Sequence, residues 1–217
     1  MKLEFQSKNQ IVYQALLQAI VREEFKPGQR LVIDDLAQRF MISQIPIREA
    51  LRQLESDGFV SFAPHFGFTV TSIHADLVAE VFALLEATEV FSSRKACQIM
   101  TSDQLEQFEQ LVREMDQSVQ NAVQWSQDNK RLHQFICECA NVPLIAGTMR
   151  KSLDHWDRLS QHFFSGVLAH RIQIAQREHW LILDAFNRRD PDAVEKVIHQ
   201  HNQSALTAYL AHLREEP

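Results

Sequence analysis

The sequence predicts a mainly α-helical protein built from two parts. Its 217 residues include only 5 Gly and 6 Pro, too few turn-forming residues for an all-β fold or a glycine-rich disordered chain. Glutamine, a good helix former, is abundant. Apolar residues make up 45% of the chain and charged residues 23%, which is enough to build ordinary hydrophobic cores.

The negative charge of the chain is confined to its second part. A net charge of −6, taken over the whole chain, argues against nucleic-acid binding, because phosphates attract basic surfaces. Residues 1–72, however, carry eight basic and eight acidic side chains, so the excess of acidic residues lies in residues 73–217. Nucleic-acid binding therefore remains open for the first third.

The three cysteines, Cys97, Cys137 and Cys139, do not make a disulfide framework, because their number is odd and the chain is long enough to fold without one. We interpret them as reduced, buried thiols of an intracellular protein. The chain has no signal-peptide pattern and no run of 18 apolar residues. We therefore expect a cytoplasmic protein with no membrane partner.

The first part, residues 1–72, has the element order of a winged helix-turn-helix. Apolar spacing predicts helices, and turn residues such as Gly58 separate them from a hairpin of two strands. The expected elements are helices over about 9–24, 34–40 and 44–57 and strands over 59–62 and 68–71.

The third of these helices is the candidate DNA-reading element. A three-residue turn, 41–43, sets it across the second helix, so that its first turn projects outward toward a major groove. Gln44 and Arg48 can contact base edges there, and Ser43, the expected N-cap, suits a phosphate. The alternative interpretation is a generic three-helix bundle with exposed polar residues.

The same region resembles the DNA-binding domain of the GntR superfamily of transcription regulators. The resemblance lies in Leu36-Ala37, in Ser43 and in the run from Pro46-Ile47-Arg48-Glu49 to Gly58-Phe59-Val60. The string Pro64-x2-Gly67-Phe68 is similar to the wing of that domain. The resemblance implies that double-stranded DNA is the partner, and its contacts carried over by position are Ser43, Gln44, Ile45, Arg48, His65 and Gly67.

Three positions depart from the family pattern. The family commonly has Arg-Thr where this chain has Gln44-Ile45, and Arg where it has Phe66. Glutamine can read adenine, and isoleucine can contact a thymine methyl group. We therefore expect an operator richer in A·T pairs than is usual for the family, bound with fewer phosphate contacts.

The second part, residues 73–217, predicts an antiparallel all-helical bundle, the architecture in whose core ligand and metal sites often form. Ser102 is expected to cap the second helix of this part, and Asp190 the last one. The expected helices run from about 74, from 102, over 123–140, from 144 toward 164, over 170–187 and over 191–214.

Three of the ten histidines, His133, His179 and His201, lie on different helices of this bundle and can converge. Asn129 lies one helical turn before His133, on the same face. The spacing alone is weak support for a site, because it forms no local motif and single histidines on a bundle are more often core or surface residues.

This part resembles the FCD effector-binding domain of the FadR subfamily, in its short six-helix form. The matching strings are Leu85-Glu86, Asn129-x3-His133, Asn141-x-Pro143-Leu144, Glu178-His179 and Asp190-x10-His201. In many members one Asp and three His bind a divalent metal, and the positions here are Asn129, His133, His179 and His201. Three imidazoles and an oxygen suit zinc, with nickel as the second choice.

The site and the cavity both depart from the family pattern. Asn129 replaces the usual Asp, so we expect a retained but weakened metal site with open positions. Relatives bind small carboxylic acids, often through an Arg at the position of Phe82. We therefore expect a carboxylate effector that is less acidic or more apolar than usual, or no ligand of the usual kind, with Arg94, Arg158 or Arg171 as candidate substitute cations.

Together these features predict a ligand-responsive transcription regulator, most simply a repressor, that binds its operator as a homodimer and is not an enzyme. One alternative is a helical metal-binding or scaffolding protein without specific DNA recognition. The other is a metal-dependent hydrolase using the three histidines, which lacks an evident carboxylate acid or base because Glu178 points about 100° away from His179 on the helix.

Overall fold

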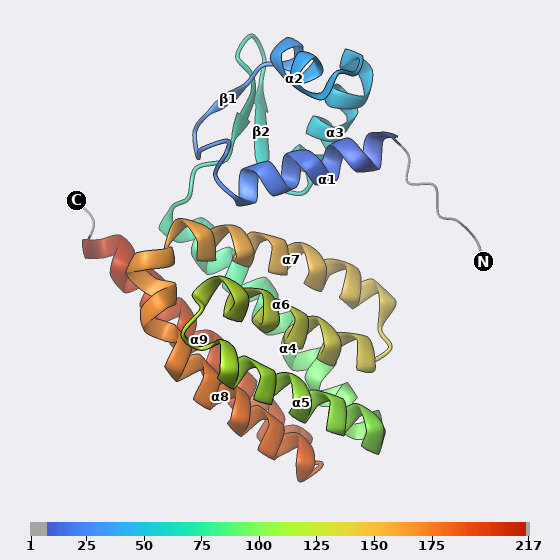
Figure 1. Cartoon of the computed structure of the whole chain (residues 1–217), viewed down its shortest axis with the longest axis vertical. Coiled ribbons are helices and arrows are strands. Elements are labelled where there is room, and N and C mark those ends of the chain that lie inside the picture. Colours follow the sequence, from blue (N-terminus) through green and yellow to red (C-terminus); the bar gives the residue numbers. More distant parts are fainter. Residues whose placement is uncertain (1–7, 216–217) are drawn as a thin grey trace. The chain divides into compact units, whose positions relative to one another are not determined.

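The computed structural model describes residues 8–215, and the chain divides after Ile73 into two compact units (Figure 1). We call residues up to Ile73 the N-terminal unit and residues from His74 the bundle, and describe each by itself. The described residues are mainly helical, and their strands form one small three-stranded sheet, as the composition predicts.

The N-terminal unit has the predicted order of three helices and a hairpin, with one further strand. In the sheet, β3 lies between β1 and β2 and is antiparallel to both, with Phe62 paired to Phe68. The elements are α1 (Lys8–Val21), β1 (Arg30–Leu31), α2 (Ile33–Phe40), α3 (Gln44–Ser56), β2 (Val60–Ala63) and β3 (Gly67–Val70).

Residues with special backbone conformations mark the ends of α2 and α3. Met41 ends α2 with φ +53°, and its N–H bonds to the carbonyls of Ala37 and Gln38. Ser43 occupies the N-cap position of α3 in extended conformation but makes no side-chain capping bond, so the prediction of a capping hydroxyl is wrong in that detail. Gly58, with φ +83°, follows α3 where a left-handed residue is required.

The apolar face of α3 is the centre of the N-terminal core. Ile47, Leu51 and Leu54 are fully buried against α1 and the sheet. Full burial of each side chain contributes about 1.5–3 kcal/mol. This packing leaves the opposite face of α3 exposed and fixes the direction in which its first turn points.

The bundle contains the six predicted helices, and their boundaries lie within about three residues of the predicted ones (Figure 1). Helix α4 packs against α7 and α9, while α5 packs against α6. The elements are α4 (Ala75–Ile99), α5 (Ser102–Ser118), α6 (Ala122–Cys139), α7 (Pro143–His162), the π-helical turn η1 (Phe164–Leu168), α8 (Ala169–Asn187) and α9 (Pro191–Glu215).

Two helix starts show how local chemistry sets the bundle boundaries. Thr101, not Ser102, caps α5, and it forms a capping box with Gln104. Asp190 caps α9 as predicted, because its Oδ1 accepts bonds from the N–H groups of Asp192 and Ala193. The turn η1 was not predicted, since no local sequence signal distinguishes a π-helical turn from an α-helix.

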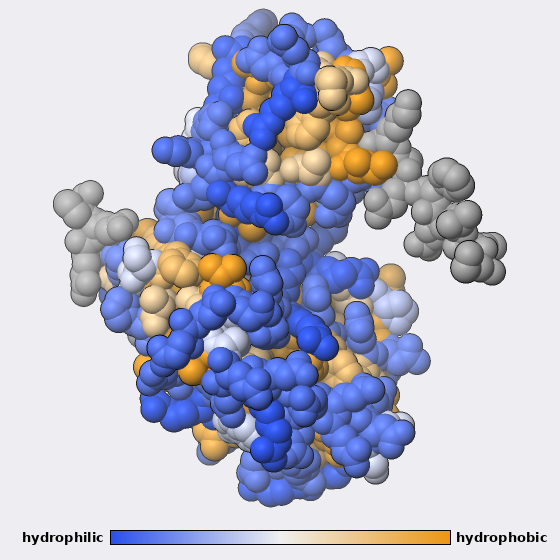
Figure 2. Space-filling model, viewed as in Figure 1, coloured by the Kyte–Doolittle hydropathy of each residue, from blue (hydrophilic) through white to orange (hydrophobic). Residues whose placement is uncertain are grey.

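The surface of the bundle is mainly hydrophilic on the face shown in Figure 2. Within residues 8–215, no helix is both long and apolar enough to cross a membrane. All three cysteines are free and buried, as expected for structural thiols.

Candidate DNA-reading face and candidate metal centre

The first turn of α3 presents the predicted DNA-reading residues to solvent. Ser43, Gln44, Ile45 and Arg48 are all exposed, and Ile45 is 69% exposed despite its apolar side chain. Since the buried face of α3 fixes the helix, these four side chains form one outward surface.

An open groove lies beside this surface and reaches the hairpin. Its lining includes Arg30 of β1, Gln44 and Arg48 of α3, and Gly67 of β3. Gln44 Nε2 donates to Asp34 Oδ1 at 2.5 Å, which holds the amide at the edge of the groove. Among the described residues, Arg30 and Arg48 have no side-chain hydrogen bond or ion pair, so both guanidinium groups are available to a phosphate or a base.

The hairpin that joins β2 to β3 carries the other two predicted contacts, His65 and Gly67. Both have positive φ, +68° and +83°, a conformation that suits a tight turn. The N–H of Phe66 bonds to the carbonyl of Ala63 at 3.1 Å and closes the turn. His65 is exposed at this tip, on a defined backbone.

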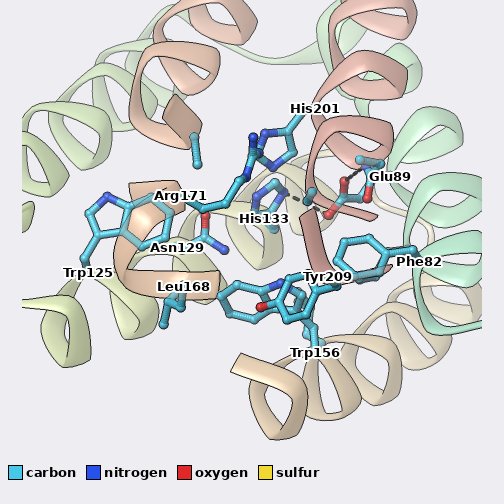
Figure 3. A pocket seen from close by; sticks show the side chains of 15 residues that line it. Phe82, Glu89, Trp125, Asn129, His133, Trp156, Leu168, Arg171, His201 and Tyr209 are labelled. Atoms are coloured by element: carbon cyan, nitrogen blue, oxygen red, sulfur yellow. Dashed lines mark hydrogen bonds and ion pairs between the residues drawn. The ribbon is translucent and has the colours of Figure 1, made fainter. Parts of the chain in front are cut away.

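The structure brings the three predicted histidines together in the core of the bundle. His133 on α6, His179 on α8 and His201 on α9 are buried, and one nitrogen of each lies within 4.8 Å of the other two. The ring centroids are 5.0 to 5.5 Å apart. Figure 3 shows His133, His201 and Asn129 facing the same cavity. This arrangement gives three imidazoles converging on one point from three helices.

Each histidine is oriented by a hydrogen bond at Nδ1. His133 Nδ1 lies 2.9 Å from Glu89 Oε1, and His201 Nδ1 lies 2.8 Å from Glu178 Oε2. His179 Nδ1 has a longer contact, 3.5 Å, to Gln176 Oε1. Because carboxylate and amide oxygens accept, Nδ1 is the donor in these contacts, and in the neutral tautomer with this proton Nε2 keeps its lone pair. This is the tautomer that metal-binding histidines require.

Two buried atoms at this point have no hydrogen-bond partner among the described residues, Asn129 Oδ1 and His179 Nε2. An unpaired buried acceptor costs about 1–3 kcal/mol. Both atoms are electron-pair donors, so a cation between them and the other two Nε2 atoms would remove this cost. The donor set therefore fits a divalent transition metal.

The surroundings of the cluster favour an ionised Glu178 and neutral imidazoles at His179 and His201. Burial lowers the pKa of His179 well below its ordinary value, with His201, His133 and Arg171 adding to the shift, and burial also lowers the pKa of His201. Burial opposes ionisation of Glu178, but hydrogen bonds from His201 and Arg171 outweigh it and hold that pKa at about 2. The resulting neutral imidazoles suit metal coordination.

Several residues of this centre were not predicted to take part. Glu89 on α4 and Gln176 on α8 orient two of the imidazoles, and Glu178 does not point away from the site, since it bonds to His201 across two helices. Asp128, the residue before Asn129, accepts hydrogen bonds from Ser118 and Gln124.

A cavity adjoins the histidines, and its remaining walls are mostly aromatic and apolar (Figure 3). Of the three candidate arginines, Arg171 lines the cavity, where it pairs with Glu178 at 2.7 Å. Arg94 pairs with Asp192 and Glu195 at the surface, and Arg158 is buried outside the cavity wall. The aromatic and apolar lining residues are Phe82, Leu85, Trp125, Leu153, Trp156, Leu168 and Tyr209.

Comparison with known proteins agrees with this architecture. Residues 8–70 match the bacterial regulatory proteins of the gntR family, and residues 80–204 match the FCD domain. The chain is 27% identical over 213 residues to the HTH-type transcriptional repressor RspR of Escherichia coli, covering 97% of this chain and 92% of that protein. It is 23% identical to the repressor NanR of Cronobacter sakazakii, covering 94% of this chain and 85% of NanR.

Solved structures share the fold. Escherichia coli McbR/YncC superposes with a TM-score of 0.79 at 19% identity, covering 95% of this chain and 99% of that one. A GntR regulator from Rhodococcus sp. RHA1 gives a TM-score of 0.76, also at 19% identity and with the same coverage of both chains.

The fold and the two matches define a DNA-binding transcriptional regulator with an effector-binding domain. The chain belongs to the GntR family of bacterial regulatory proteins and carries an FCD domain. Members of this family are regulators and not enzymes, so the hydrolase alternative is wrong.

The buried imidazoles predict that the metal-free bundle loses stability in acid. The pKa of His179 is depressed in the fold from an ordinary 6.5, so below pH 6.5 the unfolded chain binds a proton that the folded chain does not. Stability should therefore fall as the pH drops from 6.5, by up to about 1.4 kcal/mol per pH unit for this group. Thermal unfolding of chelated protein between pH 7.5 and 5.5 measures this.

His179→Gln should reduce that acid dependence, whereas His170→Gln, at an exposed position on the same helix, should leave it unchanged. An equal pH dependence in the wild type and in His179→Gln contradicts the assignment of a buried neutral imidazole.

Proposed function

We propose that this protein is a repressor whose binding to an operator is controlled by an organic acid in a metal-containing cavity of the bundle. It acts as a homodimer, because one recognition helix reads one half-site and two related half-sites make a pseudo-palindromic operator. The repressor names of RspR and NanR support the sign of regulation. The observation that carries the proposal is the convergence of three correctly oriented imidazoles beside a cavity.

The metal ligands are His133, His179 and His201 through Nε2, with Asn129 through Oδ1. Zinc is the expected ion and nickel the second choice, since both accept imidazole nitrogen together with oxygen. When bound, the ion supplies a Lewis acid that attracts an anionic oxygen. Asn129 offers a neutral oxygen in place of a carboxylate, so affinity is lower than with Asp at this position.

The effector is a carboxylate with an apolar or aromatic body. Phe82, Trp156 and Tyr209 line the cavity beside the histidines, and aromatic rings stack on flat apolar ligands. Arg171 is the arginine of the lining, and Glu178 already pairs with it. A ligand with several carboxylates would therefore find too few positive partners, whereas a monocarboxylate needs only the metal.

The DNA contacts are Ser43, Gln44, Ile45 and Arg48 in the major groove and the hairpin tip with His65 and Gly67. The two unpaired guanidinium groups of Arg30 and Arg48 support this interface. If no duplex is bound specifically, the scaffolding alternative gains support. A gel shift with the DNA upstream of the protein's own gene distinguishes these two functions.

Zinc binding tests the metal proposal. After chelation and dialysis, zinc should bind at one equivalent per chain in isothermal titration. His133→Ala should abolish this binding, while His199→Ala, an exposed histidine on α9 that pairs with Glu86, should not.

Two further variants keep the zinc experiment informative if His133→Ala folds poorly. Asn129→Asp should bind zinc more than tenfold more tightly, because it restores a carboxylate ligand. Glu89→Gln should bind about 10- to 100-fold more weakly, because it weakens the orientation of His133. Unchanged zinc affinity in all three variants would contradict the site.

The effector class can be tested with benzoate and citrate on zinc-loaded protein. Benzoate should change the tryptophan fluorescence, because Trp125 and Trp156 line the cavity, and citrate should bind more weakly. Phe82→Arg adds a cation at the cavity wall and should reverse the order of the two ligands. Preference of the wild type for citrate would overturn the monocarboxylate assignment.

Arg48→Ala tests the recognition helix. It should weaken binding to the natural operator by about 1–3 kcal/mol and relax sequence preference at one base pair in each half-site. Fluorescence anisotropy with operator variants measures both effects. Arg22→Ala, an exposed arginine after the end of α1, is the matched control and should bind normally. Unaltered sequence preference in Arg48→Ala contradicts the assignment.

A further inference from the structure

The DNA-reading face of the N-terminal unit exposes large apolar side chains. Met41 in the turn before α3 is 90% exposed, Ile45 in α3 is 69% exposed, and Phe66 at the hairpin tip is 72% exposed. The exposure of Phe66 is unusual because the hairpin has an apolar core available, in which Phe68 is buried. The tip therefore presents its aromatic ring outward.

The backbone holds Phe66 in this outward position. His65 before it and Gly67 after it both have positive φ, and the N–H of Phe66 closes the turn onto Ala63. The strands behind the tip are braced, since the rings of Phe62 and Phe68 lie 5.0 Å apart and the Arg52 guanidinium lies 4.2 Å from the Phe62 ring. Little backbone conformational entropy is therefore lost when a partner buries the ring.

The groove between α3 and the hairpin indicates where that partner lies. Arg30 and Arg48 line it with unpaired guanidinium groups, as a phosphate backbone requires. A phosphate backbone separates the major groove of DNA from the minor groove. With α3 in the major groove on one side of this backbone, we expect the hairpin tip to lie over the adjacent minor groove.

We infer that Phe66 is a wedge that enters the minor groove of the operator and partly unstacks one base step. This inference rests on the proposed DNA-binding mode. Proteins that insert apolar side chains in this way bend the duplex away from the wedge, toward the major groove. The free-energy cost of this unstacking is lowest at a flexible pyrimidine–purine base step such as TA or CA. Burial of the Phe66 ring contributes favourable binding free energy. This contribution takes the place of the phosphate contact that an arginine at the same position would make.

Bending and unstacking can be measured on the full-length protein with a duplex that it selects from a random pool. Fluorescent dyes at the two ends report the bend by energy transfer. A 2-aminopurine at each step of the minor groove next to the half-site reports unstacking. With the wild type, the dye distance should shorten and one 2-aminopurine position in each half-site should brighten.

Phe66→Ala should abolish both signals and weaken binding by about tenfold, whereas Phe66→Leu should retain both, because leucine is also an effective wedge. Phe66→Arg should recover affinity without unstacking and should steepen the slope of log K against log salt by about 1. Ile11→Ala removes an exposed apolar side chain from α1 of the same unit and is the matched control.

The outcomes separate this inference from the proposed function. Failure of the wild type to select any duplex overturns both. Specific binding by the wild type without bending or 2-aminopurine brightening overturns the wedge alone. Equal affinity, bend and unstacking in the wild type and Phe66→Ala likewise overturn it. In that case Phe66 is an exposed tip residue without a role in DNA recognition.

Discussion

The hydrogen bonds at the Nδ1 atoms of two buried histidines, His133 and His201, are the constraint on which the bundle depends. They require Glu89 of α4 to meet His133 of α6, and Glu178 of α8 to meet His201 of α9. These pairs hold α4 against α6 and α8 against α9, and Asn202 of α9 links the two, because its Nδ2 donates to Glu89 Oε2 at 2.6 Å. Burying such groups is expensive unless each finds its partner, so the polar cluster disfavours arrangements of the helices that separate these pairs.

The same constraint prepares the bundle for a ligand. One nitrogen of each of the three imidazoles lies within 4.8 Å of the other two, and Asn129 Oδ1 and His179 Nε2 have no hydrogen-bond partner among the described residues. The aromatic walls begin directly beside this centre, so a small anion bound there also contacts apolar surface. A ligand that binds one arrangement of the helices better than another can change the equilibrium between them, and the proposed control of DNA binding depends on such a shift.

Much of the fold could be predicted from local sequence signals. Gly58 and Asp190 mark element ends through their own backbone or side-chain chemistry, and Ile47, Leu51 and Leu54 mark the buried face of α3 by their spacing. Where two adjacent residues can serve as a cap, as at Thr101 and Ser102, the sequence does not distinguish them, because the geometry of the preceding chain decides.

The candidate site was predictable only in part. The three histidines follow from the resemblance to the FCD domain and not from their spacing. Their orienting partners could not be predicted, because Glu89 lies 44 residues before His133 and the pair forms only when α4 and α6 pack. The partner of Glu178 could not be predicted either, because the position of Glu178 on α8 does not determine which side chain of α9 lies next to it. Tertiary packing, and not local pattern, decides such contacts.

The central claim is that three imidazoles bind one metal ion in the core of the bundle. X-ray absorption spectroscopy at the zinc edge, on protein loaded with one equivalent of zinc, tests it most directly. The structure predicts a first shell of nitrogen and oxygen at roughly 2.0–2.1 Å with the multiple-scattering signature of three imidazoles. A shell with sulfur at about 2.3 Å, or one with fewer than three imidazoles, would contradict the account.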